Sequence, residues 1–192
     1  MRLTRPRIDP ASSERFDEVH RELFGESPRP GERILNVTRL WAIHPALMKA
    51  QRSLQIYLLR DSTLPPRLRE LAILRIGWRC NSGYELAQHA NFGLRAGLDE
   101  ADLRRLTGGP DETGWSSLEA AVLRAVDEMF DDAFVSTDTW SALELELSPE
   151  QLIDLLSVVG RYWTVSVVLN STGVQLEDDT RPFDDHLRHD EE

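Results

Sequence analysis

The feature that most restricts the fold is the segment 66–80, PRLRELAILRIGWRC, which is apolar almost all round from 71 to 78. Leu64-Pro65-Pro66 precedes it, and proline is tolerated in the first turn of a helix. A helix that is apolar on every side has to be covered on every side. We therefore expect residues 66–80 to form a central helix that is among the most buried in the molecule.

Helical periodicity and capping signals continue on both sides of this segment, whereas no hairpin signal or β-type alternation occurs. Ser116-x-x-Glu119 and Ser148-Pro149-Glu150-Gln151 are capping boxes that predict two helix starts. The sequence predicts a single-domain, all-α fold of seven to nine helices. Besides 66–80, the expected helices cover about 12–24, 34–43, 46–60, 84–96, 99–106, 116–130, 137–146 with Thr137 or Asp138 as the cap, and 148–170.

Composition excludes several classes of function. The 192 residues carry 22 basic and 33 acidic side chains, a net charge of −11, which argues against binding to duplex nucleic acid. We find no uninterrupted apolar run of membrane-spanning length and no apolar leader, so we expect a cytoplasmic protein without a membrane partner. The single cysteine excludes a disulfide framework and a Cys-x-x-Cys redox pair. Lys49 is the one lysine available for a Schiff base, and we expect it to be solvated.

The C-terminal segment 175–192 differs in composition from the rest of the chain. It holds eight acidic residues and two arginines, with few large apolar side chains. We expect residues 1–174 to form the helical domain and 175–192 to be an acidic tail that is mobile or loosely docked. His186 and His189 within this tail are expected to be solvated rather than metal ligands.

Reactive side chains gather in the region 70–89. Ser82, Glu85 and His89 fall at i, i+3 and i+7, a spacing that places them on one helix face. Glu85 and His89 lie at the edge of the apolar stripe, so we expect partial burial. Burial raises the pKa of a carboxyl group and lowers that of a histidine, while their mutual attraction opposes both shifts. Such a pair can titrate near neutrality, as acid–base catalysis requires. Glu70 heads the apolar helix, and an antiparallel packing of the two helices allows it to reach His89.

Simpler explanations of the same residues remain open. The spacing of Glu85 and His89 by itself favours a weak surface pair, because acidic residues are frequent in this chain. Cys80 is either a nucleophile paired with His89 or a small buried residue at a helix end, and the second interpretation is favoured.

The stretch ELAILRIGWRCNSGYELAQHANFGLRAGL (70–98) resembles the core motif of the carboxymuconolactone decarboxylase and alkylhydroperoxidase D superfamily. Its redox branch has Glu, eleven residues, Cys-x-x-Cys, three residues and His. Here the register is E-x11-S-x2-E-x3-H, so Ser82 and Glu85 stand where the redox cysteines would be, and Tyr84 matches a common aromatic. LWAIHPAL (40–47) and the stretch 142–174 are similar to further segments of the family.

The resemblance implies an all-helical AhpD-like bundle and a chemistry closer to the decarboxylase branch, which has Glu and His where Glu85 and His89 stand. Glu70, Glu85 and His89 become the candidate catalytic residues of a cofactor-independent acid–base enzyme without a metal. Its substrate would be a small carboxylated or lactone-like molecule, transformed by decarboxylation, another lyase reaction or lactone processing. The resemblance also implies a homo-oligomer, a trimer or hexamer. The expected substrate-binding residues are Cys80, Ser82, Tyr84, Trp78 and Trp163.

Two alternatives to this function are retained. One is a peroxidase-like thiol enzyme using Cys80, although dithiol chemistry needs an attacking and a resolving thiol and the chain has one. The other is a non-catalytic helical binding or assembly protein that keeps the scaffold.

Overall fold

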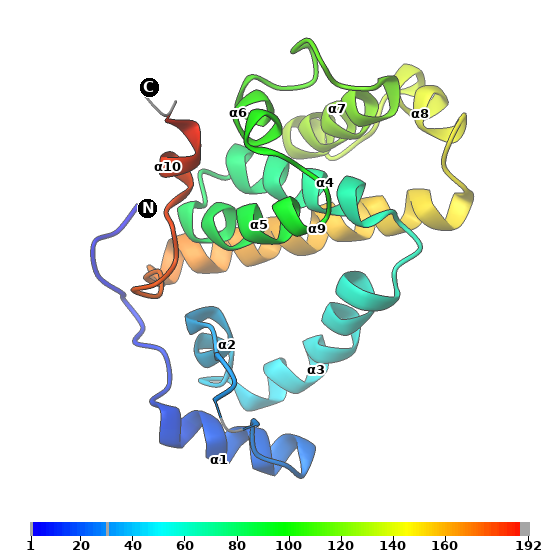
Figure 1. The fold of residues 1–192 in the computed structure, drawn as a ribbon. Coiled ribbons are helices and arrows are strands. Elements are labelled where there is room, and N and C mark those ends of the chain that lie inside the picture. The colour runs from blue at the N-terminus through cyan, green and yellow to red at the C-terminus, as the bar shows by residue number, and fades with distance from the viewer. Residues whose placement is uncertain (1, 30, 189–192) are drawn as a thin grey trace.

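Helix α4 (Pro66–Arg79) lies at the centre of the computed structural model, which describes residues 2–29 and 31–188 (Figure 1). It packs on α5 (Gly83–Arg95), α7 (Ser117–Asp132) and α9 (Pro149–Thr172). Every residue from Glu70 to Gly77 is buried. The expectation of a central, buried helix here is confirmed, because the neighbours cover all sides of its apolar surface.

The remaining elements are also helical, and the described part of the chain, 2–29 and 31–188, holds no strand. Serine capping boxes open α7 and α9 as expected, but Ser136 rather than Thr137 or Asp138 caps α8, since its hydroxyl accepts from the Thr139 amide. The all-α prediction is confirmed, with one helix more than the upper expected number. The other elements are α1 (Ser13–Phe24), α2 (Asn36–Trp41), α3 (Pro45–Ile56), a π-helical turn (Tyr57–Asp61), α6 (Glu100–Gly108), α8 (Thr137–Glu144) and α10 (Phe183–Leu187).

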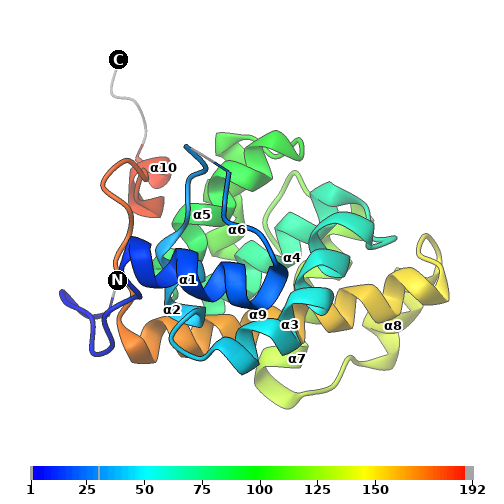
Figure 2. The same cartoon turned by 90° about the horizontal axis from the view of Figure 1, so that it is seen from below.

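Helices α1 to α3 form an arm that stands beside the body made by α4 to α9 (Figures 1 and 2). The arm has its own small apolar cluster, which includes Phe16 and Val19. At its junction with the body, buried Asp154 of α9 accepts hydrogen bonds from Tyr57 Oη at 2.9 Å and the Thr63 amide at 2.7 Å. These contacts fix the turn between α3 and α4, and with it the position of the arm relative to α9.

Helix α9 is long and apolar enough to span a membrane by length and composition, although the sequence has no uninterrupted apolar run of that length. Half of its most apolar window is buried inside the protein. Its buried face packs on α4, which accounts for much of that apolar character. The expectation of no membrane partner therefore stays a prediction.

The C-terminal segment is docked, so the expectation of a mobile or loosely docked tail is wrong for residues 175–188. Phe183 is 3% and His186 1% exposed, and α10 packs on α5 and α6. His186 Nδ1 lies 3.0 Å from Glu100 Oε2, which replaces its expected solvation. Composition could not show that two side chains among many acids enter the core. His189 lies outside the described residues.

Candidate functional site

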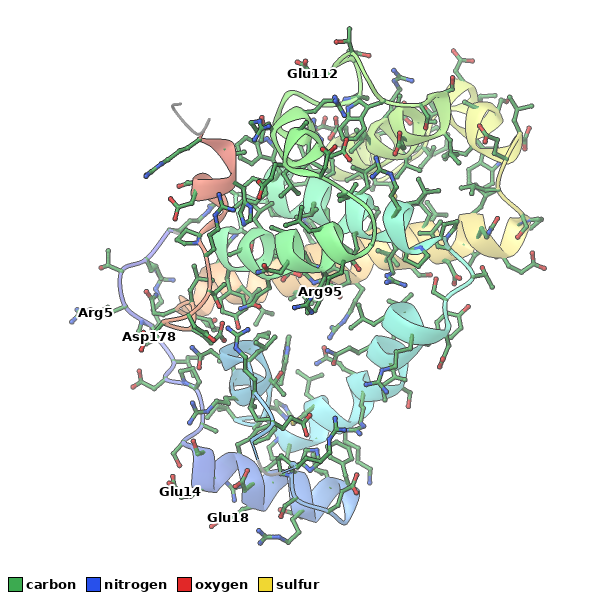
Figure 3. The ribbon with its side chains drawn as sticks, in the orientation of Figure 1. Arg5, Glu14, Glu18, Arg95, Glu112 and Asp178 are labelled. Atoms are coloured by element: carbon green, nitrogen blue, oxygen red, sulfur yellow. The ribbon has the colours of Figure 1, made fainter. Side chains whose placement is uncertain are left out.

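A cavity of about 460 Å³ lies between the arm and the body. Helix α2, the end of α3, the π-helical turn, α4, α5 and α9 all contribute side chains to its wall. Figure 3 shows Arg95 on the side of α5 that faces the arm. The wall includes Trp41, Arg60, Arg69, Glu70, Tyr84, Glu85, Gln88, His89, Phe92, Arg95, Arg161 and Tyr162.

The structure brings Glu70, Glu85 and His89 together at this wall. His89 Nδ1 lies 2.7 Å from Glu70 Oε2, and His89 Nε2 lies 3.1 Å from Glu85 Oε1. The contact between α4 and α5 depends on a tight turn in which Asn81 adopts a left-handed conformation, with φ of 50°. Asparagine tolerates this conformation better than most residues do. Both imidazole nitrogens are thus occupied by carboxylates from two helices.

Glu85 and His89 are more buried than their place at the edge of an apolar stripe suggested. Glu85 is 4% and His89 6% exposed. The Tyr162 ring of α9 stands edge-on to the His89 ring at 4.8 Å between centroids, and Phe92 lies at 5.2 Å. Phe92 lies three residues after His89 on α5 itself, whereas Tyr162 comes from α9, which the α5 pattern does not reveal. Together the two rings cover the pair.

Electrostatics in this cluster favour a charged histidine. Burial by itself would lower the pKa of His89, but hydrogen bonds to Glu70 and Glu85 and the attraction of both carboxylates raise it to about 9. Burial would raise the pKa of Glu70, yet His89 and Arg69 hold it below its ordinary value. At neutral pH the cluster is therefore an imidazolium between carboxylates, a buried store of one transferable proton.

Glu70 is held on both sides. Its Oε1 accepts from Arg69 Nε at 3.2 Å while its Oε2 faces His89. With both oxygens engaged, Glu70 is arranged to orient the imidazole rather than to hold substrate or water. Glu85 has one oxygen on His89 and also lines the cavity. Of the two carboxylates, Glu85 is the better placed to exchange a proton with a bound molecule.

Tyr84 lines the cavity as expected, and it is held there by a residue that the sequence analysis missed. Tyr84 Oη donates to Glu177 Oε1 at 2.7 Å and accepts from the Val37 amide at 3.2 Å. The same glutamate accepts from the Asn36 amide at 2.6 Å and from Gln88 Nε2. Glu177 thereby joins the C-terminal segment, α2 and α5, and no local sequence signal distinguished it from the other tail acids.

Four expected cavity residues lie elsewhere, so their assignment to the cavity wall is wrong. Trp78 packs against Phe183, with ring centroids 6.2 Å apart, and Trp163 is 50% exposed. Cys80 and Ser82 are buried near the turn between α4 and α5 and do not line the cavity. The cavity meets α5 at Tyr84 and beyond, and Trp163 projects from α9 about 100° away from Tyr162.

The wall also contains four arginines that the sequence analysis did not single out: Arg60, Arg69, Arg95 and Arg161. Arginine is so frequent in this chain that no pattern marked these positions. Among the residues described by the structure, no group of three or more His, Cys, Asp and Glu side chains is arranged to hold a metal ion. The absence of a metal from the working protein stays a prediction.

Comparison with known proteins finds a family whose model matches part of the chain. The carboxymuconolactone decarboxylase family matches residues 45–128, a span that includes Glu70, Glu85 and His89. No curated protein sequence matches the chain.

Several solved structures share the fold. An uncharacterized peroxidase-related protein from Silicibacter sp. TM1040 superposes with a TM-score of 0.68 at 17% identity, over 93% of this chain and 92% of its own. An alkylhydroperoxidase AhpD core protein from Ralstonia eutropha JMP134 gives 0.66 at 16% identity, over 86% and 85%. The debrominase Bmp8 gives 0.69 at 14% identity, over 96% and 98%.

The fold thus occurs in small-molecule enzymes, as the debrominase illustrates, and the family match falls on the helices that carry the histidine cluster. Residues 45–128 thus match the carboxymuconolactone decarboxylase family, and the chain has the fold of AhpD-like proteins.

Proposed function

We propose that this chain is a cofactor-independent acid–base enzyme that acts on a small carboxylated or lactone-like molecule as a carboxy-lyase or lactone-processing enzyme. The observation that carries the proposal is the buried His89, held between Glu70 and Glu85 at the wall of a cavity. Such clusters of perturbed ionisable groups are typical of catalytic sites. The proposal includes a homo-oligomeric, cytoplasmic protein.

In this proposal the three residues of the cluster have different roles in proton transfer. Glu85 exchanges the proton with substrate, His89 returns or withdraws a proton through Nε2, and Glu70 keeps the imidazole in position through Nδ1. In a decarboxylation, the bond to the leaving carboxylate breaks and the electron pair passes into an adjacent carbonyl as an enolate. The His89–Glu85 pair then delivers one proton to carbon and regains it from water, while the nearby positive charge stabilises the enolate.

The alternatives receive less support. Burial raises the pKa of the Cys80 thiol, and Cys80 lies outside the cavity wall, so neither reactivity nor access favours a thiol mechanism. A non-catalytic scaffold would have to retain three buried ionisable groups beside a cavity without using them. Removing water from charges is costly, which makes such a cluster an unfavourable choice for packing alone.

The proposal is tested by incubating the protein in D₂O with a panel of small carboxylic acids and carboxylated lactones. NMR would follow deuterium entry next to carbonyl groups, loss of carboxylate and ring opening. We expect at least one compound to react, and Glu85→Gln to slow that reaction by about 10²–10⁴-fold. Exposed Glu112→Gln is the matched control. Full activity in Glu85→Gln, or no reaction across the panel, would favour the scaffold alternative.

A further inference from the structure

Arg161 of α9 is a half-buried arginine on the cavity wall that the proton-transfer cluster does not use. Its guanidinium lies 5.6 Å from the centre of the Trp41 ring, and its Nη1 donates to the Gln51 amide oxygen. No carboxylate in the described residues 2–29 and 31–188 lies within ion-pair distance of it. Burial lowers the pKa of Arg161 from its ordinary value, which reflects a charge that the protein leaves poorly compensated.

Several other partly buried arginines of this chain have carboxylate partners. Arg67 contacts Glu119 Oε1 at 2.7 Å and Asp102 Oδ2 at 2.9 Å. Arg75 makes a bidentate pair with Asp127, at 2.8 and 2.7 Å. Buried cations are normally paired in this way, because removing them from water is costly.

Within the described chain, Arg39, Arg52 and Arg104 are also partly buried without an ion pair, but they do not line the cavity. Of the two wall arginines that are not exposed, Arg69 pairs with Glu70, whereas Arg161 has no carboxylate partner among the described residues. An anion in the cavity would complete its pairing.

The charge of the cavity wall supports an anionic occupant. Four arginines and the protonated His89 stand there against two carboxylates, so the wall is positive. The whole chain, by contrast, carries a net charge of −11. A positive cavity in an acidic protein concentrates anions at one place and leaves the rest of the surface unattractive to them. Arg60 and Arg95, both exposed, are placed to guide an anion inward.

We propose that Arg161 anchors a substrate carboxylate, and that the cavity selects a carboxylate joined to a flat, largely apolar body. This assignment deepens the proposed function and rests on it for the identity of the bound molecule as a substrate. The guanidinium fork matches a carboxylate in two parallel hydrogen bonds, and Gln51 and Trp41 hold that fork in place. Trp41, Tyr84, Phe92 and Tyr162 supply aromatic walls for the flat body.

The anchored carboxylate is not the one that reacts. An ion pair with arginine stabilises a carboxylate in the ground state, and this opposes its loss as carbon dioxide. Arg161, Glu85 and His89 line the same cavity, so a substrate held at Arg161 presents its second functional group to Glu85 and His89. The substrate is therefore at least bifunctional, with one retained carboxylate and a second carboxylate or a lactone that reacts.

Binding of two probes of nearly the same shape tests the anchor without requiring turnover. Benzoate carries the carboxylate, and benzamide replaces it with a neutral amide. Calorimetric titration of the full chain at neutral pH should show tighter binding of benzoate. Arg161→Gln should weaken benzoate by about 10-fold or more and leave benzamide within about twofold, because a charge-assisted bidentate pair is lost.

Two further variants keep the result interpretable. Arg161→Lys retains the charge without the fork and should bind benzoate with intermediate affinity. Exposed Arg15→Gln removes an arginine charge outside the cavity wall; it is the matched control and should leave benzoate affinity within about twofold. Circular dichroism of each variant checks that the helices persist.

The proposal is overturned if the wild type does not prefer benzoate, or if Arg161→Gln binds it as the wild type does. Failure of the proposed function gives a different pattern. In that case Glu85→Gln would leave any turnover unchanged, while the preference for benzoate and its loss in Arg161→Gln would persist.

Discussion

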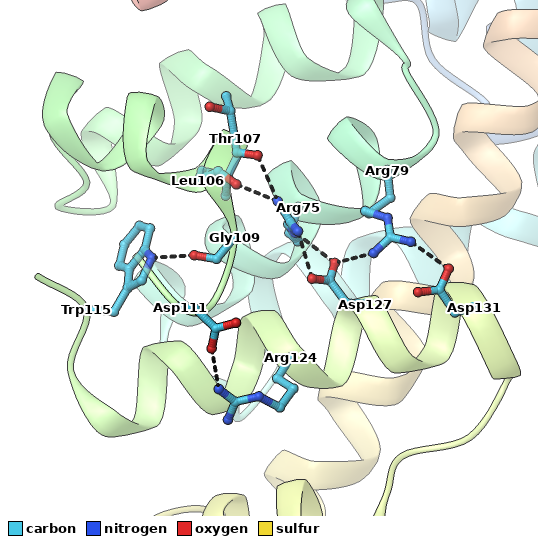
Figure 4. Close-up of polar contacts among 10 residues, drawn as sticks. All are labelled: Arg75, Arg79, Leu106, Thr107, Gly109, Asp111, Trp115, Arg124, Asp127 and Asp131. Carbon is cyan, nitrogen blue, oxygen red and sulfur yellow. Dashed lines mark hydrogen bonds and ion pairs between the residues drawn. The ribbon is translucent and has the colours of Figure 1, made fainter. Parts of the chain in front are cut away.

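Helix α4 carries two clusters of buried charge on different sides, and they differ in what surrounds them. Glu70 meets His89 and Glu85 at a cavity. Arg75 instead faces α6 and α7, where its guanidinium forms a bidentate pair with Asp127 and donates to the Leu106 carbonyl at 2.7 Å (Figure 4). Neither Arg75 nor Asp127 lines that cavity.

The difference teaches that burial and charge alone do not identify an active site. The Arg75 cluster is saturated by fixed partners, which include both Asp127 oxygens and a backbone carbonyl, so it joins helices and has no capacity for a ligand. In the first cluster one histidine is shared by two carboxylates, and Glu85 faces a space large enough for a small molecule. The first cluster therefore differs from the second in two ways: a small molecule in the cavity can reach it, and it holds a proton that can be transferred.

The largest expected effect is on turnover. His89→Gln removes the transferable proton and should reduce turnover of a substrate identified in the D₂O panel by about 10²–10⁴-fold. Arg79→Gln, in the second cluster, should leave turnover within about twofold. Arg79 contacts Asp127 and Asp131, at 3.0 and 2.6 Å, and does not line the cavity. Similar losses in both variants would mean that the two clusters do not differ in function.

The second prediction concerns stability, for which we expect the Arg75 cluster to be important. Arg75→Met leaves Asp127 without its bidentate partner and should lower the free energy of unfolding by about 3–5 kcal/mol. The matched control is Arg124→Met, whose exposed pair with Asp111 at 3.1 Å should contribute less than about 1 kcal/mol. Urea unfolding followed by circular dichroism measures both. Equal losses would show that the buried pair is no more important than the exposed one.

The sequence anticipated what depends on local pattern. Residues 66–80 are apolar all round and do form the central helix, and the antiparallel packing of α4 on α5 does bring Glu70 to His89. It did not anticipate contacts between distant segments. The proposed role of Arg161 depends on its contact with Trp41 and on the absence of a carboxylate partner among the described residues. Neither can be deduced from the sequence immediately around Arg161.

Glu177 is a second residue whose contacts with distant segments could not be predicted from the sequence. Its segment is polar and acidic, which predicted a loose tail, yet Glu177 accepts hydrogen bonds from Tyr84, Gln88 and the Asn36 amide. Net charge over a segment describes its average solvation and not the fate of one side chain. The tryptophan assignments failed for a related reason, because which face of α4 or α9 meets the cavity is set by the arm, not by the helix itself.

The third prediction is a pH dependence that belongs to the first cluster. The pKa of His89 is raised from 6.5 to about 9 in the folded protein. Its contribution to stability is therefore complete below pH 6.5 and is lost as the pH rises through about 9. Between these limits the wild type should lose at least about 1 kcal/mol of unfolding free energy.

His89→Gln should flatten this part of the profile, because glutamine does not titrate. Arg124→Met, which changes an exposed pair far from the histidine in the sequence, should keep the slope of the wild type. A slope that survives in His89→Gln would assign the titration to other groups and would remove the evidence for a charged histidine between the two carboxylates.

The smallest expected effect concerns Cys80, a third reactive group at the end of α4. It is buried, as both clusters are, and burial raises the pKa of its thiol. Unlike the Glu70–His89–Glu85 cluster, it lies outside the cavity wall. Cys80→Ser should therefore change turnover by less than about twofold, since an inaccessible thiol with little thiolate is unreactive. Hydroperoxide turnover with a dithiol reductant should be negligible in both proteins. Robust hydroperoxide turnover that Cys80→Ser abolishes would move the chemistry from the histidine cluster to the thiol, and access to the cavity would no longer be the property that distinguishes a functional group on α4.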